Sequence, residues 1–200
     1  MAETFPNQPP LLVGSIGRRS SGYWGMVFVV ISEASLFAYL FFAYFYFAVQ
    51  QHSGGWPPSG PPSLAYAIPQ TICLLFGCAS MWWAERGVTR GDRSGLLIGL
   101  AVTLVLAAAF VVLQSLDWSD KPFSLATDTY SSLYFTITGL HLVHLVAGLI
   151  MVAAVLLWSF LGYFGLLRHA PIPATALYWY FVTVIWLALF FTIYITPYLG

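Results

Sequence analysis

Five long apolar segments, separated by short polar ones, dominate the pattern of residues along the chain. Each apolar segment reaches or exceeds the roughly 20 residues that an α-helix needs to cross about 30 Å of hydrocarbon. Because hydrocarbon offers no water to the backbone, a spanning segment must satisfy its own hydrogen bonds and is expected to be helical. The pattern predicts an all-α polytopic membrane protein with five transmembrane helices in an antiparallel bundle, over about residues 22–49, 64–84, 96–116, 129–163 and 175–199.

Basic residues are distributed unevenly over the segments that connect the five spans. If successive spans alternate in direction, Lys121 lies on one face of the membrane. The remaining basic residues lie on the opposite face: Arg18, Arg19, Arg86, Arg90, Arg93 and Arg168. Short loops rich in Lys and Arg stay on the cytoplasmic side of a membrane. This bias predicts a cytoplasmic N-terminus and a periplasmic or external C-terminus.

The chain is expected to consist of a cytoplasmic segment, residues 1–21, and one membrane domain, residues 22–200. The first span is too long for the apolar region of a signal peptide and lacks a convincing small-residue cleavage site, so we expect it to be retained. The cytoplasmic loops, of about ten residues each, place consecutive helices side by side. Four glycines stand where small residues permit close approach of helices: Gly95, Gly99, Gly139 and Gly148.

Composition supports a membrane protein and excludes other classes. Hydrophobic residues make up 60% of the chain and charged residues 7%, whereas soluble domains carry about 25% charged residues. The net charge is zero and no basic tract occurs, so nothing indicates nucleic-acid binding. Cys73 and Cys78 lie five residues apart in the second span. This spacing favours neither a metal site nor a disulfide framework, and we interpret both as packing residues.

Glu33 is an acidic residue within the first span. It lies about 11 residues into that span, or roughly 16 Å along a helix, which is near the middle of the membrane. An ionised carboxylate is costly at that depth, by about 2.5–3.5 kcal/mol on insertion scales. Two interpretations follow: a proton relay, or a neutral carboxyl that joins two helices by a hydrogen bond. We favour the second, because no chain of further carboxylates accompanies Glu33.

Two histidines, His141 and His144, lie three residues apart in the fourth span and therefore share one helix face. His141 is predicted at nearly the depth of Glu33, so a contact from Glu33 to either histidine would reduce the desolvation cost of both groups. Metal ligation is the alternative, but carboxylate–histidine sites in helix bundles repeat their motif on a second helix. No second motif occurs here, and no metal is expected. Gln114 and Asp117 are further polar positions, at the external end of the third span.

With these features, the chain resembles subunit III of the haem–copper terminal oxidases over essentially all five spans. Five segments carry the resemblance. The first span holds its intramembrane Glu in a Ser-Glu pair, and the fourth span matches the pattern Gly-x-His-x-x-His…Gly. Gln114 with Asp117-Trp118 is similar to a Gln-x-x-Glu-Tyr element of the family. In this chain the Ser-Glu pair of the first span is Ser32-Glu33. The pattern of the fourth span is formed by Gly139, His141, His144 and Gly148.

The last span departs from the family pattern at two polar positions. Its sequence from Tyr178 to Trp186 is similar to a family segment that normally reads Trp-His-Phe-Val-Asp-x-x-Trp. Tyr180 stands where the His is usual, and Thr183 stands where the Asp is usual. In the second span, Gly77-Cys78 stands where a pair of Ser is usual. We interpret the changes at Tyr180 and Thr183 as a replacement of the family's polar pair by hydroxyl hydrogen bonding.

The resemblance implies a non-catalytic subunit of a proton-pumping terminal oxidase that reduces oxygen to water in aerobic respiration. Such a subunit docks on subunit I, contacts subunit II and other membrane subunits, binds structural phospholipid, and supports proton uptake and the stability of the complex. No cofactor is expected on this chain, because the family carries its haem and copper on partner subunits. Five spans match the short bacterial form, which implies a bacterial inner membrane.

Two alternatives remain at this point. A related subunit III-like protein associated with nitric oxide reductase shares the Glu and the histidine pair. A stand-alone proton-coupled transporter or channel belongs to a different class, and Glu33 and His141 at similar depth are what suggest it. Transporters usually show more intramembrane polar groups and an internal repeat, and neither is evident in this sequence.

Overall fold

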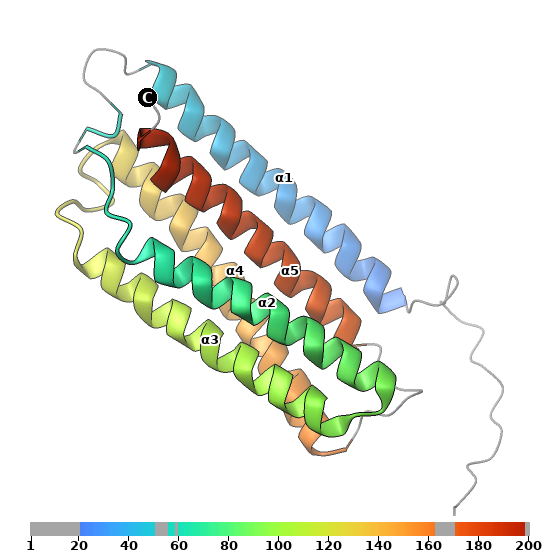
Figure 1. Ribbon diagram of the computed structural model, residues 1–200. Helices are drawn as coiled ribbons and strands as arrows, with labels where there is room; N and C mark the ends of the chain where they lie inside the picture. Colours follow the sequence, from blue (N-terminus) through green and yellow to red (C-terminus); the bar gives the residue numbers. More distant parts are fainter. Residues whose placement is uncertain (1–20, 51–55, 59, 163–170, 199–200) are drawn as a thin grey trace, which may run out of the picture.

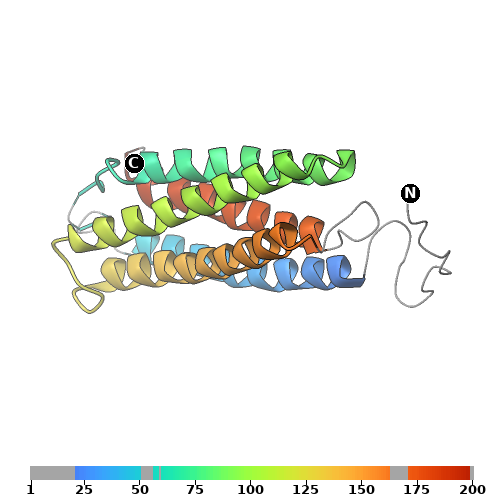
Figure 2. The ribbon, with the colours of Figure 1, turned by 90° about the horizontal axis from the view of Figure 1, so that it is seen from below.

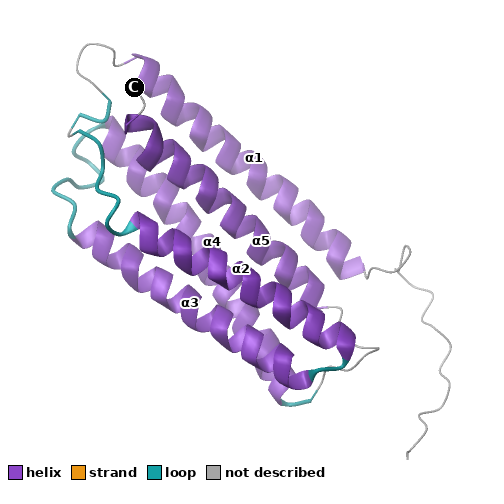
Figure 3. Ribbon diagram, in the orientation of Figure 1, coloured by secondary structure: helices purple, strands orange, loops and turns teal. Residues whose placement is uncertain are grey.

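The computed structural model describes residues 21–50, 56–58, 60–162 and 171–198 (Figure 1). Five long helices are present, and each is long and apolar enough to cross a membrane. The described residues contain no strand (Figure 3), so the predicted all-α class with five spanning helices is confirmed. The helices are α1 (Ser21–Gln50), α2 (Ala67–Arg90), α3 (Arg93–Ser119), α4 (Thr129–Phe160) and α5 (Pro171–Leu189).

The five helices lie lengthwise against one another and form an elongated bundle (Figures 1 and 2). Helix α5 is central, because it packs against α1, α2 and α4, while α3 packs against α2 and α4. At its C-terminal end, α5 continues as a π-helix over Phe190–Ile195 and a short 3₁₀ helix over Thr196–Tyr198. Large aromatic side chains from α5 and its neighbours fill the core, among them Trp179, Trp186 and Tyr134.

Helix α1 is attached to the bundle through one narrow face. In its most apolar stretch, 6% of the residues are buried, compared with 61% in α5. Phe37 and Tyr44 are its buried residues. They follow Glu33 by four and eleven positions, so all three lie on the same face of the helix. The other faces of α1 expose apolar side chains, as expected of a helix surrounded by hydrocarbon.

The connection between α2 and α3 is shorter than the sequence predicts. The prediction of a loop of about ten residues is wrong here. Helix α2 continues through Arg90, and only Gly91 and Asp92 separate it from α3. Gly91 adopts φ 74°, and the turn returns the Asp92 N–H to the Gly87 carbonyl, a conformation that glycine adopts most easily. The Asp92 carboxylate caps α3 by accepting from the Gly95 N–H at 3.0 Å, which lowers the pKa of Asp92.

Small residues bring α2 and α3 into close contact. A Cβ atom on Gly99 would lie 2.8 Å from the Ala84 Cβ and 2.9 Å from the Ser80 carbonyl oxygen. The Ser80 hydroxyl uses this proximity and donates to the Gly99 carbonyl at 2.7 Å. Of the four predicted glycines, Gly99 therefore makes a close helix approach, and a Cβ on Gly148 would meet Tyr178 at 3.4 Å. A Cβ on Gly95 would meet the Asp92 side chain, and one on Gly139 would meet only Trp118, at 3.9 Å.

Other predicted boundaries shift by a few residues. Helix α5 begins at Pro171 rather than at residue 175, because proline is well tolerated in the first turn of a helix. Helix α2 begins at Ala67 rather than at residue 64. The predicted cytoplasmic segment lies, except for Ser21, outside the described residues, as do Arg18, Arg19 and Arg168.

We expect Gly99→Ala to destabilise the bundle by about 1–3 kcal/mol, because the added methyl group overpacks the α2–α3 contact. Gly139→Ala is the matched control: its methyl group has space, and Ala is favoured over Gly within a helix by about 1 kcal/mol. The free energy of unfolding of both variants, measured by denaturant titration in detergent micelles, checks the expectation. Equal stability of the two variants would contradict the close contact.

Candidate functional site

Glu33 and His144 form a direct polar contact between α1 and α4. The Glu33 Oε2 atom lies 2.9 Å from the His144 Nε2 atom. The Glu33 side chain is 33% exposed and the His144 side chain 11%, so the contact lies at the edge of the bundle rather than at its centre. Of the two contacts considered from the sequence, the structure shows the one to His144.

The hydrogen bonds of His144 determine how protons are arranged in this pair. The His144 Nδ1 atom lies 2.7 Å from the Leu140 carbonyl oxygen. A carbonyl oxygen can only accept, so Nδ1 carries a hydrogen and donates it. If the imidazole is neutral, its Nε2 atom is then an acceptor, and Glu33 must be protonated to donate to it. If the imidazole is charged, Glu33 is a carboxylate. In either arrangement, one proton is shared between Glu33 and His144, and the pair has no net charge.

Residues from α1 and α5 hold this pair in place. The Phe37 ring, one turn after Glu33 on α1, packs edge-on against the His144 ring with 5.1 Å between centroids. From α5, the Tyr178 hydroxyl donates to the His144 backbone carbonyl at 3.2 Å. The pair therefore lies where α1, α4 and α5 meet, and it contributes a polar link to the narrow face that attaches α1.

His141 lies apart from Glu33, inside the bundle. Its imidazole is fully enclosed and packs against Phe110 and Trp186, with centroid distances of 5.6 Å and 5.1 Å. Its Nε2 atom donates to the Val182 carbonyl of α5 at 3.2 Å, and its Nδ1 atom has no hydrogen-bond partner among the residues that the structure describes. His141 thus links α4 to α5, whereas His144 links α4 to α1.

Asp117 is buried near the C-terminal end of α3. The Lys121 ammonium lies 2.9 Å from its Oδ1 atom. The hydroxyls of Tyr134 and Tyr194 donate to its Oδ2 atom, at 2.6 Å and 3.0 Å. Both carboxylate oxygens therefore have partners, and the cluster joins α3, α4 and the π-helix. One turn earlier, Gln114 accepts a hydrogen bond from Gln70 of α2 at 3.2 Å.

Tyr180 and Thr183 make hydrogen bonds with two different residues of α2. The Tyr180 hydroxyl donates to the Glu85 carboxylate at 3.3 Å. The Cys78 thiol lies 3.2 Å from the Thr183 hydroxyl, which itself donates to the Trp179 carbonyl. The two hydroxyls do form hydrogen bonds, as the sequence comparison suggested, but they link α5 to α2 separately rather than as one pair.

Several partners in these contacts were missed by the sequence reasoning. Lys121 follows Asp117 by four residues, a spacing that favours an ion pair within a turn of helix, and this signal was available. Glu85, Tyr134 and Tyr194 are brought to their partners by tertiary packing, and no local pattern indicates them. Among the described residues, no three His, Cys, Asp or Glu side chains gather where they could hold a metal ion.

Comparison with known proteins gives a consistent result. The model of the family "Cytochrome c oxidase subunit III" matches residues 18–198. The "Cytochrome c oxidase subunit 3" of Prototheca wickerhamii is 34% identical over 177 residues, which cover 86% of this chain and 68% of the relative. The proteins of the same name from Scyliorhinus canicula and Sus scrofa are each 32% identical, with the same coverage.

The family match extends over all five spanning helices and includes the segments that supply Glu33, His141 and His144. A subunit of this kind is a multi-pass membrane component of a multi-subunit oxidoreductase complex. The chain belongs to the cytochrome c oxidase subunit III family.

Proposed function

We propose that this chain is a non-catalytic subunit of a proton-pumping haem–copper terminal oxidase of a bacterial inner membrane. It docks on subunit I and contacts subunit II, while these partners carry the haem and copper. The observation that carries the proposal is the family match over residues 18–198. In this role the chain supports proton uptake and the stability of the complex that reduces oxygen.

The orientation of the chain follows from its charges. Arg86, Arg90 and Arg93 lie at the end of the bundle where α2 turns into α3, and Lys121 lies at the opposite end (Figure 1). The positive-inside bias supports a cytoplasmic location for the arginine-rich end. The N-terminal end of α1 lies at this same end of the bundle (Figure 1), which supports the proposal of a cytoplasmic N-terminal end for α1.

A groove between α3 and α4 supports the proposed binding of structural phospholipid. The groove has a volume of about 600 Å³. At one end, the Arg93 guanidinium donates to the Phe160 carbonyl at 2.9 Å and presents further N–H groups at the membrane surface. An acyl chain fits the apolar walls while the phosphate lies near Arg93. The lining residues are Leu97, Ile98, Ala101, Leu104, Ala153, Leu156, Leu157 and Phe160.

The lipid proposal is tested by filling the groove. We expect Ala101→Trp to reduce the phospholipid that remains bound to the purified protein, because the indole occupies the space of an acyl chain. Ala108→Trp, on an exposed part of the same helix outside the groove, is the matched control. Quantifying phospholipid by mass spectrometry in both variants gives the result. Equal lipid content in the two variants would exclude this groove as the site.

Assembly with the oxidase is tested by purification in mild detergent. We expect an affinity-tagged chain to bring down a haem-bearing subunit I, visible as a Soret band in the visible spectrum. Recovery of a nitric oxide reductase in its place would favour the related family variant. A chain recovered without any partner, in a membrane where the oxidase is abundant, would favour a stand-alone transporter or channel.

The role of Glu33 is tested by two substitutions. A Gln side chain keeps the shape of Glu and has an N–H that donates to the His144 Nε2 atom, so Glu33→Gln should preserve assembly and oxygen reduction. Glu33→Ala leaves the His144 Nε2 atom without its partner, at a cost of about 1–3 kcal/mol, and should weaken the attachment of α1. Oxygen consumption, proton release and subunit content are measured in both variants. An assembled Gln variant without turnover would show that Glu33 is an obligatory proton carrier.

A further inference from the structure

Helix α1 lies at one edge of the bundle, and most of its surface faces away from the other helices (Figure 1). That outward surface carries polar side chains among its apolar ones. At 3.6 residues per turn they fall within a sector of about 60°, nearly opposite the inner face that holds Glu33, Phe37 and Tyr44. The residues of this outer polar stripe are Ser32, Ser35, Tyr39, Tyr46 and Gln50, and all five are exposed.

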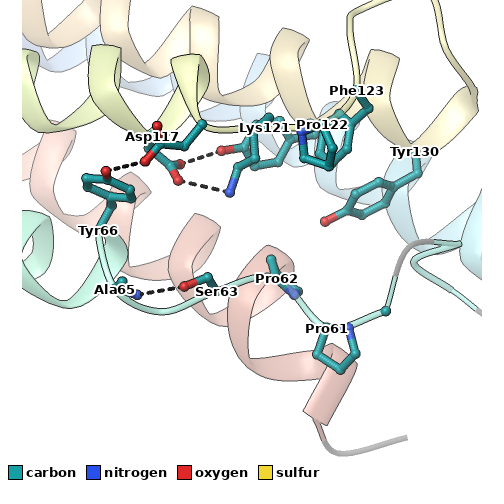
Figure 4. Close-up of a pocket in the computed structure, with 13 residues that line it drawn as sticks. Pro61, Pro62, Ser63, Ala65, Tyr66, Asp117, Lys121, Pro122, Phe123 and Tyr130 are labelled. Carbon is teal, nitrogen blue, oxygen red and sulfur yellow. Dashed lines mark hydrogen bonds and ion pairs between the residues drawn. The ribbon is translucent and has the colours of Figure 1, made fainter.

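Among the helices that the structure describes, α1 differs from the others in the middle of the membrane. In the middle third of α2, α3, α4 and α5, each exposed side chain is aliphatic, or aromatic without a hydroxyl. The charged residues at the external end of the bundle are paired within the chain, as Asp117 and Lys121 are at 2.9 Å (Figure 4). Polar residues within a membrane usually face protein or water rather than lipid, so the stripe marks a surface that another protein covers.

Tyr39 is the residue of the stripe that is least suited to lipid. It is 68% exposed, and its hydroxyl makes no hydrogen bond to any part of the chain that the structure describes. The other members of the stripe are satisfied locally. The Ser32 and Ser35 hydroxyls donate to carbonyls of their own helix at 2.8 Å and 3.0 Å, and the Gln50 amide donates to the Tyr46 hydroxyl at 2.8 Å.

The depth of Tyr39 keeps its hydroxyl away from water. Helix α1 has 30 residues, and Tyr39 lies three to four residues beyond its midpoint, or about 5 Å along the axis. A hydrocarbon layer of about 30 Å centred on the helix therefore encloses this position. Side chains lean toward the N-terminal end of a helix, so the phenol is directed back toward the middle of the layer. Its hydroxyl needs a partner from another protein segment.

Small residues beside Tyr39 leave room for such a segment. Ser32 and Ser35 lie two turns and one turn before it on the same face, and small side chains allow two helices to approach closely. A spanning helix that crosses α1 here can contact both serines and lie within reach of the Tyr39 hydroxyl.

We propose that the outer polar stripe of α1 is the docking surface for a spanning helix of another oxidase subunit, which offers a hydrogen-bond acceptor to the Tyr39 hydroxyl. This inference rests on the proposed function for the identity of the complex. It adds the face of the chain that meets the partner and the kind of group that the partner presents.

A second copy of this chain fits the stripe less well. Two copies inserted in the same direction are related by an axis perpendicular to the membrane, so Tyr39 would meet Tyr39 at one depth. One hydroxyl could donate to the other, but the second donor would remain unused. The two facing rings would also hold the serines of the two helices apart.

Photo-cross-linking in the intact membrane identifies what covers the stripe. The photoreactive residue p-benzoylphenylalanine replaces Tyr39 in the full chain, and cells are irradiated before solubilisation. Val105 of α3 is the matched control position, because it is 67% exposed on an apolar outer face. We expect position 39 to cross-link to a haem–copper oxidase subunit, identified by mass spectrometry of the joined peptides, and position 105 to cross-link to lipid.

The substitution Tyr39→Phe tests the hydroxyl itself. We expect it to weaken association with the partner subunit about threefold to tenfold, as the loss of one hydrogen bond implies. The measured quantity is the partner retained per chain as the complex is diluted in mild detergent. Tyr46→Phe is the matched control, because residue 46 lies near the membrane surface, where water replaces a lost bond. Both side chains are exposed, so both variants retain the bundle.

The outcomes separate this inference from the proposed function. Cross-linking of position 39 to a second copy, or to lipid alone while the oxidase co-purifies, would overturn the docking surface and leave the proposed function intact. Equal protein cross-linking from positions 39 and 105 would overturn it as well, as would unchanged association in Tyr39→Phe. Recovery of the chain without any oxidase subunit would refute the proposed function and, with it, this inference.

Discussion

The structure depends on one constraint: inside hydrocarbon, most polar groups must find a partner within the protein. An unsatisfied group there costs several kcal/mol. The backbone meets the constraint by forming helices through all five spans. Polar side chains meet it in two ways. Hydroxyls such as those of Thr71 and Ser159 donate to carbonyls of their own helix, whereas Glu33 and Asp117 are paired with residues of neighbouring helices.

Paired polar groups also determine how the helices are aligned. Apolar packing in a membrane gains little from removing surface from lipid, so close contacts and hydrogen bonds set the register between helices. Several neighbouring pairs of helices have such a link. Ser80 joins α2 to α3, His141 joins α4 to α5, and Trp186 donates to Thr71 of α2 at 2.9 Å. Sliding one helix past another would break these bonds and leave their members unpaired.

The sequence predicts the number and type of the helices well, because long apolar segments have few alternatives in a membrane. The prediction from sequence fails at the α2–α3 turn. The apolar segment ends near residue 84, but the helix continues to Arg90 in the more polar interface. Within the site, depth along the helices indicated that Glu33 would meet the fourth span. Depth alone could not distinguish His141 from His144, because that choice depends on which way α4 is rotated. The partners Glu85 and Tyr194 depend on tertiary packing, for which a single sequence has no local signal.

The weak attachment of α1 gives the Glu33–His144 pair its particular importance. Most of α1 faces outward, and Phe37 and Tyr44 are the buried residues of its inner face. Partly buried apolar residues of α1 pack beside them against the core: Met26, Val30, Ala34, Leu40 and Phe41. The hydrogen bond between Glu33 and His144 adds a directional contact between α1 and α4, beside the edge-on packing of the Phe37 ring on the His144 ring. Because a hydrogen bond is directional, this pair fixes the rotation of α1 about its axis, which apolar packing on lipid-facing residues does not.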